Sequence, residues 1–411
     1  MTLSTPATTV TAFFEFPFTA EAFTLNDPVR GALDNATFRL YASTPVVLES
    51  STQQVTIRRG TSAQILPEAE AGTSVVTLLN LDRTFDPSHA SSPYFGNITP
   101  GRRFTIATAG VSIFDARVED WDLDYDVSGM STAVAKLSDG LATLARQEFD
   151  DWTATALQAA GARLSAVLDR AEVQWPSARA LDTGVSSLQG DVVAWGTNVL
   201  EYCKLVAKSD LGVLFVDRTG VLTFKDRHAV LNSPPSVTFA ADGTGIAWRR
   251  IEASYGSEVL FNRVGVTRVG GATQTVIDLD AQLSYGVRSY TAPTLLLDSN
   301  AQALDMANFI LTQYTDPQTR ISLVEVELSV LSSDEQSQVL QLDIMSVVRV
   351  VFTPNAIGVA IDRLCVIYGM DHAITPQSHV VTLHLGDADN RSVMVLDDAT
   401  FGKLDSNVLA F

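Results

Sequence analysis

Positive charge is scarce in this sequence. Of its 411 residues 28 are lysine or arginine, against 47 aspartates and glutamates, and the formal net charge is −19. Extended contact with phosphate backbones needs clustered cations, so this balance argues against a protein that binds nucleic acid. The same acidity suits a surface past which DNA slides without being held, although solubility alone would also account for it.

Cysteine is scarce as well, and the patterns that hold metals are missing. Cys203 and Cys365 are far apart and each stands in an apolar pattern, which is typical of reduced core thiols in a protein made in a cytoplasm. The sequence has no CxxC, HExxH or HxH pair, the spacings that zinc and iron–sulfur sites use. We therefore predict no disulfide, no metal site and no cofactor.

Long apolar runs are missing too. No run approaches the roughly 18 residues that a membrane-spanning helix needs, and the Ser/Thr-rich residues 1–11 lack the regions of a signal peptide. Hydrophobic residues nevertheless make up 46% of the chain, enough for several domains with cores of their own. We expect a soluble protein without a membrane span.

Strand-like segments are what the sequence has in quantity. They are rich in β-branched and aromatic residues and lie between turn residues. In residues 116–125 apolar and charged residues alternate, which buries one face of the strand and leaves the other wet. The strand candidates are 37–41, 55–58, 74–79, 104–107 and 113–125, and later 320–330, 345–353, 363–370 and 379–385.

Helical periodicity appears between these two β regions. A first apolar face is formed by Leu157, Ala160, Leu164, Val167 and Leu168. A second helix runs from about residue 191 to 208, where Val192, Trp195 and Tyr202 hold helical spacing and core packing explains them better than a cofactor site. Residues 212–224 predict a β-hairpin, and residues 301–314 predict a third helix.

These patterns predict a mainly β fold with an α+β insert, in which two β-barrel or sandwich domains flank smaller mixed domains. The predicted segments are an N-terminal docking arm (1–35), a first β domain (36–148), a helical and hairpin insert (149–235), a mixed α/β domain (236–318), a second β domain (319–390) and a C-terminal arm (391–411).

The two β regions share an order of segments. Residues 102–106, 118–122 and 133–139 resemble residues 348–352, 366–371 and 380–387, and the separation of Asp122 from Asp139 matches that of Asp371 from Asp387 within one residue. Short strands look alike, so coincidence is the alternative to an internal duplication. If the duplication is real, three chains would present six similar modules around one axis.

Several short motifs also stand in a recognisable order. Residues 79–88 (LNLDRTFDPS) precede SPYF at 92–95 and PGRR at 100–103. The later motifs are VLD at 167–169, WP at 175–176, the hairpin with KDR at 225–227, YGVRSY at 285–290, YTDP at 314–317, LDD at 396–398, FGKLD at 401–405 and LAF at 409–411. In this joint order the chain resembles the minor tail proteins and baseplate hub proteins of long-tailed bacteriophages (siphoviruses) over residues 37–411.

The resemblance implies a structural virion protein at the tail tip, made in the host cytoplasm. Two tail-tube-like β domains would flank smaller domains, and a homotrimer would form a ring that closes the tube, adapts its six-fold symmetry to a three-fold tip and lets DNA pass at ejection. The implied partners are the distal tail protein, the C-terminus of the tape-measure protein, and tail fibre or receptor-binding proteins. Many relatives carry a lysin or fibre-like extension, whereas this sequence stops at Phe411.

The sequence offers no recognisable catalytic constellation beside this scaffold. The five histidines, His89, His228, His372, His379 and His384, match no nucleophile or metal pattern. Asp122 and Asp124 share a strand face, as glycosidase carboxylates would. However, Asp120, Asp122 and Asp124 continue the polar side of one strand, so an acidic lumen or solvent face explains them better. We predict no catalytic residues and no enzyme.

A receptor- or carbohydrate-binding tail adhesin is the alternative function. It would use surface aromatics, but four of the five tryptophans (Trp121, Trp175, Trp195 and Trp248, not Trp152) lie in apolar-periodic segments and most are predicted to be core. The terminal segments instead favour assembly, since their aromatic and apolar side chains are too many to leave in water. The predicted partner or oligomer contacts are Phe13, Phe14, Phe16, Phe18, Phe401, Leu404, Leu409 and Phe411.

Overall fold

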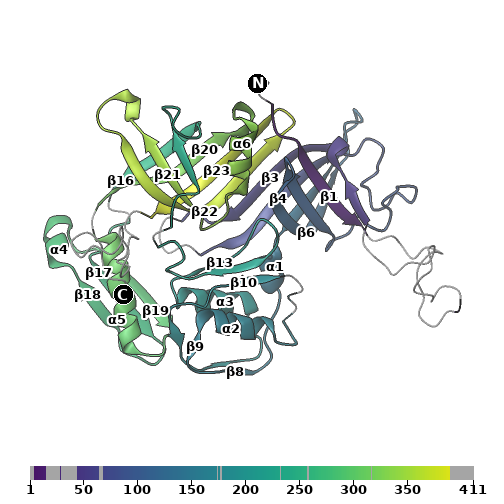
Figure 1. Cartoon of the computed structure of the whole chain (residues 1–411). Helices are drawn as coiled ribbons and strands as arrows, with labels where there is room; N and C mark the ends of the chain where they lie inside the picture. Colours follow the sequence, from purple (N-terminus) through teal and green to yellow (C-terminus); the bar gives the residue numbers. More distant parts are fainter. Residues whose placement is uncertain are drawn as a thin grey trace.

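The computed structural model describes residues 4–14, 28, 44–63, 68–173, 175, 178–231, 233–256, 259–315 and 317–388. The predicted strand at 37–41, most of the predicted N-terminal arm beyond residue 14 and the whole predicted C-terminal arm lie outside these residues. The described part is mainly β, as the sequence predicts, and most of its strands belong to one 13-stranded sheet (Figure 1).

The first part of the long sheet, here called the first sheet unit, comes from the N-terminal third of the chain. It is antiparallel and has the order β3-β4-β7-β6-β5-β1-β2. Alternation puts Val55, Ile57, Val76 and Leu78 on its buried face. Its strands are β1 (Thr8–Phe14), β2 (Thr44–Val47), β3 (Thr52–Gly60), β4 (Glu70–Leu79), β5 (Arg103–Thr108), β6 (Val111–Asp124) and β7 (Thr132–Ser138), with the 3-10 turn η1 (Glu49–Ser51).

The second sheet unit comes from the C-terminal half of the chain and has the order β16-β20-β23-β22-β21-β15. Two of its strands, β15 and β16, come from the segment 236–318 that the sequence analysis treats as a separate domain. The elements are β15 (Val237–Ala240), β16 (Arg250–Tyr255), β20 (Thr319–Glu327), η2 (Leu328–Val330), α6 (Ser333–Gln341), β21 (Val347–Phe352), η3 (Pro354–Ala356), β22 (Ile361–Thr375) and β23 (Ser378–Asp387).

The two units repeat one strand order. The first has β3-β4-β7-β6-β5 and the second has β16-β20-β23-β22-β21; beyond this shared order the first continues with β1 and β2 and the second with β15. Both also carry a one-residue bulge at the same place, at Glu119 between β6 and β7 and at Tyr368 between β22 and β23. A shared strand order and a shared bulge favour duplication over the alternative of chance resemblance between short strands.

The two units join directly. The second half of β22 pairs antiparallel with β3, and Met370 lies opposite Arg59. One hydrophobic core runs through both units. At this seam two glycines allow close approach, because a Cβ on Gly60, which has φ +78°, would stand 2.1 Å from the Tyr368 carbonyl oxygen, and one on Gly369 would stand 2.5 Å from that of Thr61.

A helical insert unit lies beneath the seam, with α1 and β13 against β4 of the long sheet (Figure 1). Its predicted hairpin is confirmed as β13 and β14, which pair antiparallel. The elements are α1 (Gly140–Leu144), β8 (Trp152–Ala154), β9 (Gln158–Ala159), α2 (Ala160–Leu168), β10 (Arg179–Leu181), β11 (Ser187–Leu188), β12 (Asp191–Val193), α3 (Val199–Lys208), β13 (Val213–Val216) and β14 (Leu222–Lys225).

The prediction of a helix from residue 191 was wrong at its start. Residues 191–193 form β12 against β8, and α3 begins only at Val199, where the Asn198 side chain accepts a hydrogen bond from the Glu201 backbone nitrogen. Gly196, with φ +79°, turns the chain between the two elements. As a result Val192 and Trp195 are exposed rather than core.

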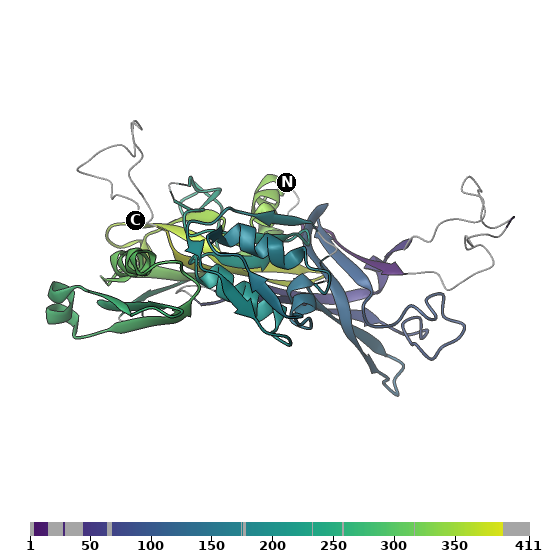
Figure 2. The ribbon, with the colours of Figure 1, turned by 90° about the horizontal axis from the view of Figure 1, so that it is seen from below.

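A side unit packs beside the insert at one end of the molecule (Figure 2). The predicted helix at 301–314 is confirmed as α5, which buries Ala303, Met306, Ala307 and Ile310 against β17 and its neighbours. The elements are β17 (Arg263–Arg268), β18 (Gln274–Ile277), α4 (Leu279–Tyr285), β19 (Ser289–Leu295) and α5 (Asn300–Tyr314). Among the helices within the described ranges, none is long and apolar enough to cross a membrane.

Candidate functional site

Alternation along the strands gives the long sheet one polar face. On β6 this face carries Asp120, Asp122 and Asp124, all exposed, while Trp121 and Leu123 turn toward the core. Lys136 on β7 lies beside them, with its Nζ 2.6 Å from Asp122 Oδ2 and 3.7 Å from Asp120 Oδ2. The hydrogen bond to Asp122 raises the pKa of Lys136. Lys136 is the only lysine of this strand pair, and its positive charge is balanced by the neighbouring carboxylates.

The polar face continues onto the second sheet unit, with the exposed Val75 of β4 between Lys136 and β3. Asp371 of β22 lies opposite Arg58 of β3, and its Oδ2 is 3.1 Å from His384 Nε2 on β23. Arg249 Nε is 3.2 Å from Glu325 Oε1 on β20. Acidic side chains on this face include Asp120, Asp122, Asp124, Asp371, Glu252, Glu325 and Glu327, and basic ones include Arg58, Lys136, Arg249 and Arg250. Further along the same face of the sheet stand Arg103, Asp115, Arg117 and the pair Arg349–Asp362.

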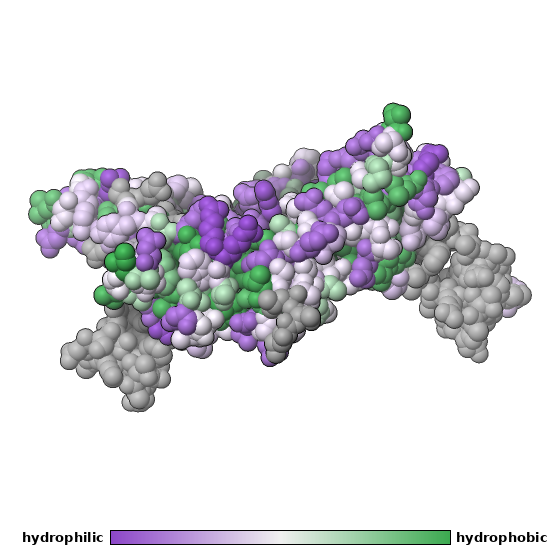
Figure 3. Space-filling view, turned by 90° about the horizontal axis from the view of Figure 1, so that it is seen from above, coloured by the Kyte–Doolittle hydropathy of each residue, from purple (hydrophilic) through white to green (hydrophobic). Residues whose placement is uncertain are grey.

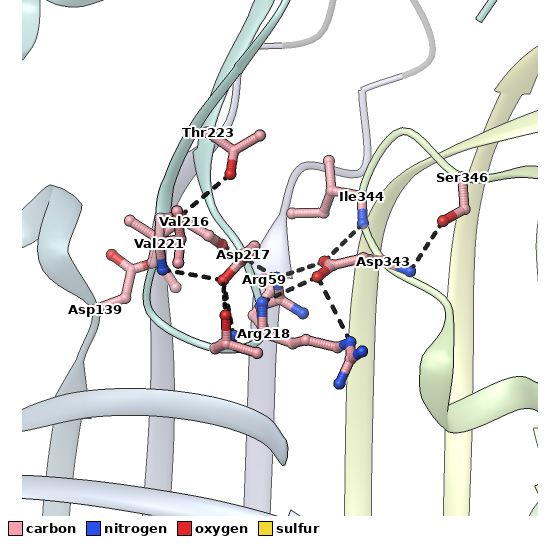
Figure 4. A network of polar contacts seen from close by, with 12 residues as sticks. Arg59, Asp139, Val216, Asp217, Arg218, Val221, Thr223, Asp343, Ile344 and Ser346 are labelled. Carbon is pink, nitrogen blue, oxygen red and sulfur yellow. Dashed lines mark hydrogen bonds and ion pairs between the residues drawn. The ribbon is translucent and has the colours of Figure 1, made fainter. Parts of the chain in front are cut away.

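A buried ion pair fixes the insert to the seam (Figure 4). Arg59 of β3, 4% exposed, donates from Nη2 to Asp343 Oδ1 at 2.6 Å and to the Val216 carbonyl oxygen of β13 at 3.1 Å. Asp343 Oδ2 accepts from the Arg218 backbone nitrogen at 3.0 Å, and Arg218 Nη1 donates to the Ser112 carbonyl of β6 at 3.0 Å. Four segments that are far apart in the sequence thus meet at one cluster.

None of the sequence patterns described above predicts this cluster, although the sequence carries a signal for it. Arg59 follows Val55 and Ile57 at two-residue spacing, so it stands in phase with the apolar side of its strand. A charged residue in that phase must find a buried partner. Its partner Asp343 lies 284 residues away in the sequence. The pattern therefore indicates that Arg59 needs a buried partner but not which residue that partner is.

Asp139 marks the passage from β7 into the insert. Its side chain accepts hydrogen bonds from the Gly72 backbone nitrogen at 2.7 Å and from the Leu141 nitrogen at 2.9 Å, and it caps α1. Burial nevertheless raises the pKa of Asp139 to about 7. The carboxyl group therefore serves as the N-terminal cap of α1.

The histidines do not converge on a site. His372 and His379 lie together in the core, whereas His384 stands on the opposite, polar face next to Asp371. His89 is on an exposed turn, and His228 packs near Phe309. Within the described ranges, no three His, Cys, Asp or Glu side chains are grouped as metal ligands. Cys203 and Cys365 are buried and form no disulfide with each other, and burial raises the pKa of the Cys203 thiol to about 12.

The terminal aromatic residues are only partly described. Phe14 on β1 is 3% exposed and packs in the first unit's core, with ring centroids 4.9 Å from Tyr94 and 6.4 Å from Phe104. Phe13 is half-buried beneath the Arg103 guanidinium, 4.9 Å from its ring centroid. The remaining predicted contacts, Phe16, Phe18, Phe401, Leu404, Leu409 and Phe411, lie outside the described residues.

The burial of the tryptophans differs from the prediction at Trp195. Trp121 and Trp248 pack against the core of the long sheet, and Trp152 and Trp175 against that of the insert. Trp195, predicted to be core, is 72% exposed, because the turn at Gly196 carries it away from α3. The upper face of the molecule shows hydrophilic side chains gathered over its middle, with hydrophobic ones between them (Figure 3).

Comparison with known proteins identifies the fold. Neither a family model nor a curated protein matches this sequence. Solved structures do match. A tail protein from Neisseria meningitidis superposes with a TM-score of 0.59 at 12% identity, over 84% of this chain and 94% of its own. The 43 kDa tail protein of prophage MuSo2 from Shewanella oneidensis gives 0.57 at 13% identity, over 85% and 97%.

A third structure extends the likeness to a related machine. A component of the Escherichia coli type VI secretion system, itself structurally similar to bacteriophage tail proteins, matches with a TM-score of 0.50 at 11% identity, over 84% of this chain and 78% of its own. The chain therefore has the fold of phage tail proteins, as the resemblance in its motifs predicts.

Proposed function

We propose that this chain is a structural hub protein, or minor tail protein, that closes the distal end of a phage tail tube as a homotrimer. The observation that carries the proposal is the repeated strand order of the two sheet units. Three chains with two such units each place six similar units around one axis, so a three-fold tip can meet a six-fold tube. The structural similarity to tail proteins supports the same role.

The polar face of the long sheet would line the channel of this ring. Its acidic excess, together with the pairing of Lys136 to Asp122, leaves few free cations to hold a phosphate backbone. DNA would pass during ejection without being bound. This role needs no catalytic group, metal or cofactor, and we assign none.

The partners would be those of a tail tip in the virion. The distal tail protein would stack on one side of the ring, the C-terminus of the tape-measure protein would reach its channel, and tail fibre or receptor-binding proteins would attach around it. Of the terminal side chains proposed as contacts, Phe14 is already used by the core of its own chain. Phe13 and the apolar residues of segments 15–18 and 401–411 remain the proposed contacts.

The mass of the purified protein in solution tests the proposal first. Light scattering should give about three times the 44.2 kDa of one chain, and negative-stain images should show a three-fold ring with a central channel. A chain that stays monomeric at every concentration, with no ring in the images, contradicts the homotrimer.

Trp195 keeps the adhesin as a second candidate. It is 72% exposed near the exposed Val192, and an aromatic ring in water is the group that a sugar-binding surface uses. An adhesin would bind isolated cell-wall glycans as a monomer and lose that binding in Trp195→Ala. A hub would oligomerise and show no glycan binding in either form.

A further inference from the structure

A cavity of about 80 Å³ lies where the insert, the side unit and the second sheet unit meet. In Figure 1 the insert and the side unit stand side by side below β22. The walls are largely apolar and include Val213 and Leu214 of β13, Phe309 and Tyr314 of α5, and Tyr368 of β22. Since roughly 150 Å³ is enough to hold a benzene molecule, a space of this size takes about one side chain. The cavity is therefore suited to part of a peptide rather than to a large cofactor.

Arg227 brings a buried positive charge to this cavity. The residue is only 8% exposed, its Cζ lies 5.7 Å from the centroid of the Phe309 ring, and its buried Nε has no hydrogen-bond partner among the described residues. The charges of Asp210, Asp226 and Asp305 act on it, but within the described part of the chain none of the three forms an ion pair with it. A buried guanidinium is costly without an acceptor at hydrogen-bond distance. The cavity thus offers a donor to an anionic group.

Two lysines of α3 add positive charge to the same cavity. Lys208 Nζ lies 2.8 Å from Glu68 Oε1. Lys204 Nζ lies 3.7 Å from Glu201 Oε1, and both pairs are partly exposed. Exposed ion pairs contribute little free energy, so either lysine can take a new partner at small cost. Among the described lining residues three are cations and Glu68 alone is acidic, in a chain whose net charge is −19. An occupant should therefore combine an apolar group with carboxylates.

The described part of the chain ends beside this cavity. Its last residue, Ala388, is 7% exposed and belongs to one apolar cluster with Tyr368 and Met345, both of which line the cavity. The sequence then continues outside the described residues, and its segment 393–398 (VMVLDD) has four apolar residues followed by two aspartates. An extended chain spans up to about 3.3 Å per residue, so the eight residues from Ala388 to Leu396 reach roughly 26 Å. A segment of the required chemistry is thus within reach of the cavity.

We propose that residues 393–398 bind in this cavity of their own chain, with Leu396 between its apolar walls and the two carboxylates that follow it against Arg227. A carboxylate accepts two parallel hydrogen bonds from a guanidinium, so it supplies the acceptors that the described residues do not. The contact lies within one chain and does not depend on the proposed trimer. It would fix the place from which residues 401–411, the proposed partner contacts, leave the body of the protein.

Trypsin digestion of the full chain measures this contact, because Arg391 precedes the segment and Lys403 follows it. Binding should shield the bond after Arg391. Arg227→Met should speed cleavage there about tenfold, because a charge-assisted hydrogen bond is lost, and should leave cleavage after Lys403 unchanged. Methionine fills the space without a charge, so the urea midpoint should stay the same or rise. A lower midpoint with unchanged cleavage would show that Arg227 serves the fold alone, and would overturn the proposal.

Replacing the carboxylates tests the other side of the contact. Asp397→Asn with Asp398→Asn should speed cleavage after Arg391 as much as Arg227→Met does, and combining all three changes should add nothing further. The matched control, Asp405→Asn, removes a carboxylate outside the segment and should leave the rate unchanged. Effects that multiply in the combined variant, or a rate that only equals that of the control, would overturn the proposal.

Disulfide trapping shows which chain provides the segment. Gln313 lines the cavity, whereas Thr312, its neighbour on α5, is exposed and does not. On mild oxidation, Leu396→Cys with Gln313→Cys should form a disulfide within one chain, seen as a monomer of altered mobility on a non-reducing gel. The control, Leu396→Cys with Thr312→Cys, should form at least about tenfold less. The native thiols Cys203 and Cys365 are buried in both variants.

The products of this oxidation decide between the possible occupants. A link within the chain for Gln313→Cys alone, together with faster cleavage in Arg227→Met, supports the proposal. Covalent dimers would place the segment of one copy in the cavity of another, and would overturn binding within the chain. No link, or equal links in both pairs, would overturn the site itself.

Discussion

His372 and His379 face each other across the hairpin of β22 and β23, with Nδ1 of the first 3.0 Å from Nε2 of the second. Both side chains are buried, at 3% and 0% exposure. Two rings that share one hydrogen bond cannot both be charged in such a place, so the folded protein holds them neutral.

This pair should make the fold sensitive to acid. Burial lowers the pKa of His379 from 6.5 to about 4, and burial together with the nearby His379 holds the pKa of His372 well below its usual value. Since both pKa values fall on folding, the pair's contribution is fully present above pH 6.5 and is lost as the pH falls toward 4. For His379 alone the loss is about 3 kcal/mol.

Urea unfolding of the wild type and of His379→Gln between pH 7 and pH 4 measures this loss. Asp139 and Asp210 titrate in both proteins, so their contributions cancel in the comparison. The wild type should lose more stability than the variant over this range. Equal losses of stability in the wild type and the variant between pH 7 and pH 4 would contradict a neutral, buried histidine pair.

Removing only one member of the Arg59–Asp343 ion pair should lower the free energy of unfolding strongly. Asp343→Ala leaves the Arg59 guanidinium buried without its carboxylate, and such a change costs about 3 kcal/mol or more. Adding Arg59→Met should recover most of that loss, because the second change removes the stranded charge. The urea midpoints of the single and double variants give the answer, and equal losses in both would show that the charge is not stranded.

Replacing Phe14 should destabilise the fold far more than replacing its neighbour Phe13. Phe14→Ala opens a cavity against Tyr94 and Phe104, which should cost about 3 kcal/mol. Phe13→Ala removes a half-buried ring and one contact with Arg103, worth less than about 1 kcal/mol. If assembly falls in Phe13→Ala while the urea midpoint is kept, Phe13 contacts a partner; equal midpoints in the two variants would contradict the packing of Phe14.

The carboxylate side chains of the polar face should keep DNA from binding. Asp122→Lys combined with Asp124→Lys should create a cationic strip, and DNA binding should appear and weaken steeply with salt. Glu49→Lys with Glu201→Lys makes the same change in charge at exposed sites elsewhere. Gel-shift titrations at two salt concentrations compare the pairs. Equal binding by both pairs would mean that net charge, rather than this face, governs contact with DNA.

Local periodicity predicted the elements whose neighbours are close in sequence. The alternation of residues 116–125 fixed the two faces of β6, and the spacing around Met306 and Ile310 located α5. The matching order of short segments anticipated the repeat, because each unit is a run of strands joined mostly by short connections. These features depend on period and on turn chemistry, which a single sequence displays.

Features that depend on tertiary context were missed. The helical spacing of Val192 and Trp195 was real but was overridden by the pairing of β12 with β8, and the cap at Asn198 set the true start of α3. Likewise, the phase of Arg59 revealed a buried charge but not Asp343 as its partner. Partners brought together by long-range strand pairing leave no mark on the local pattern.

The strand β22 has a mechanical consequence for the proposed ring. Its first half pairs with β21 and its second half with β23 and β3, so a pull that separates the two sheet units of one chain is resisted by an ion pair, a packed core and the insert clamped below. The two sheet units of one chain would therefore move as a single stiff block under load, and a ring built from such chains would widen at the joints between copies rather than within them.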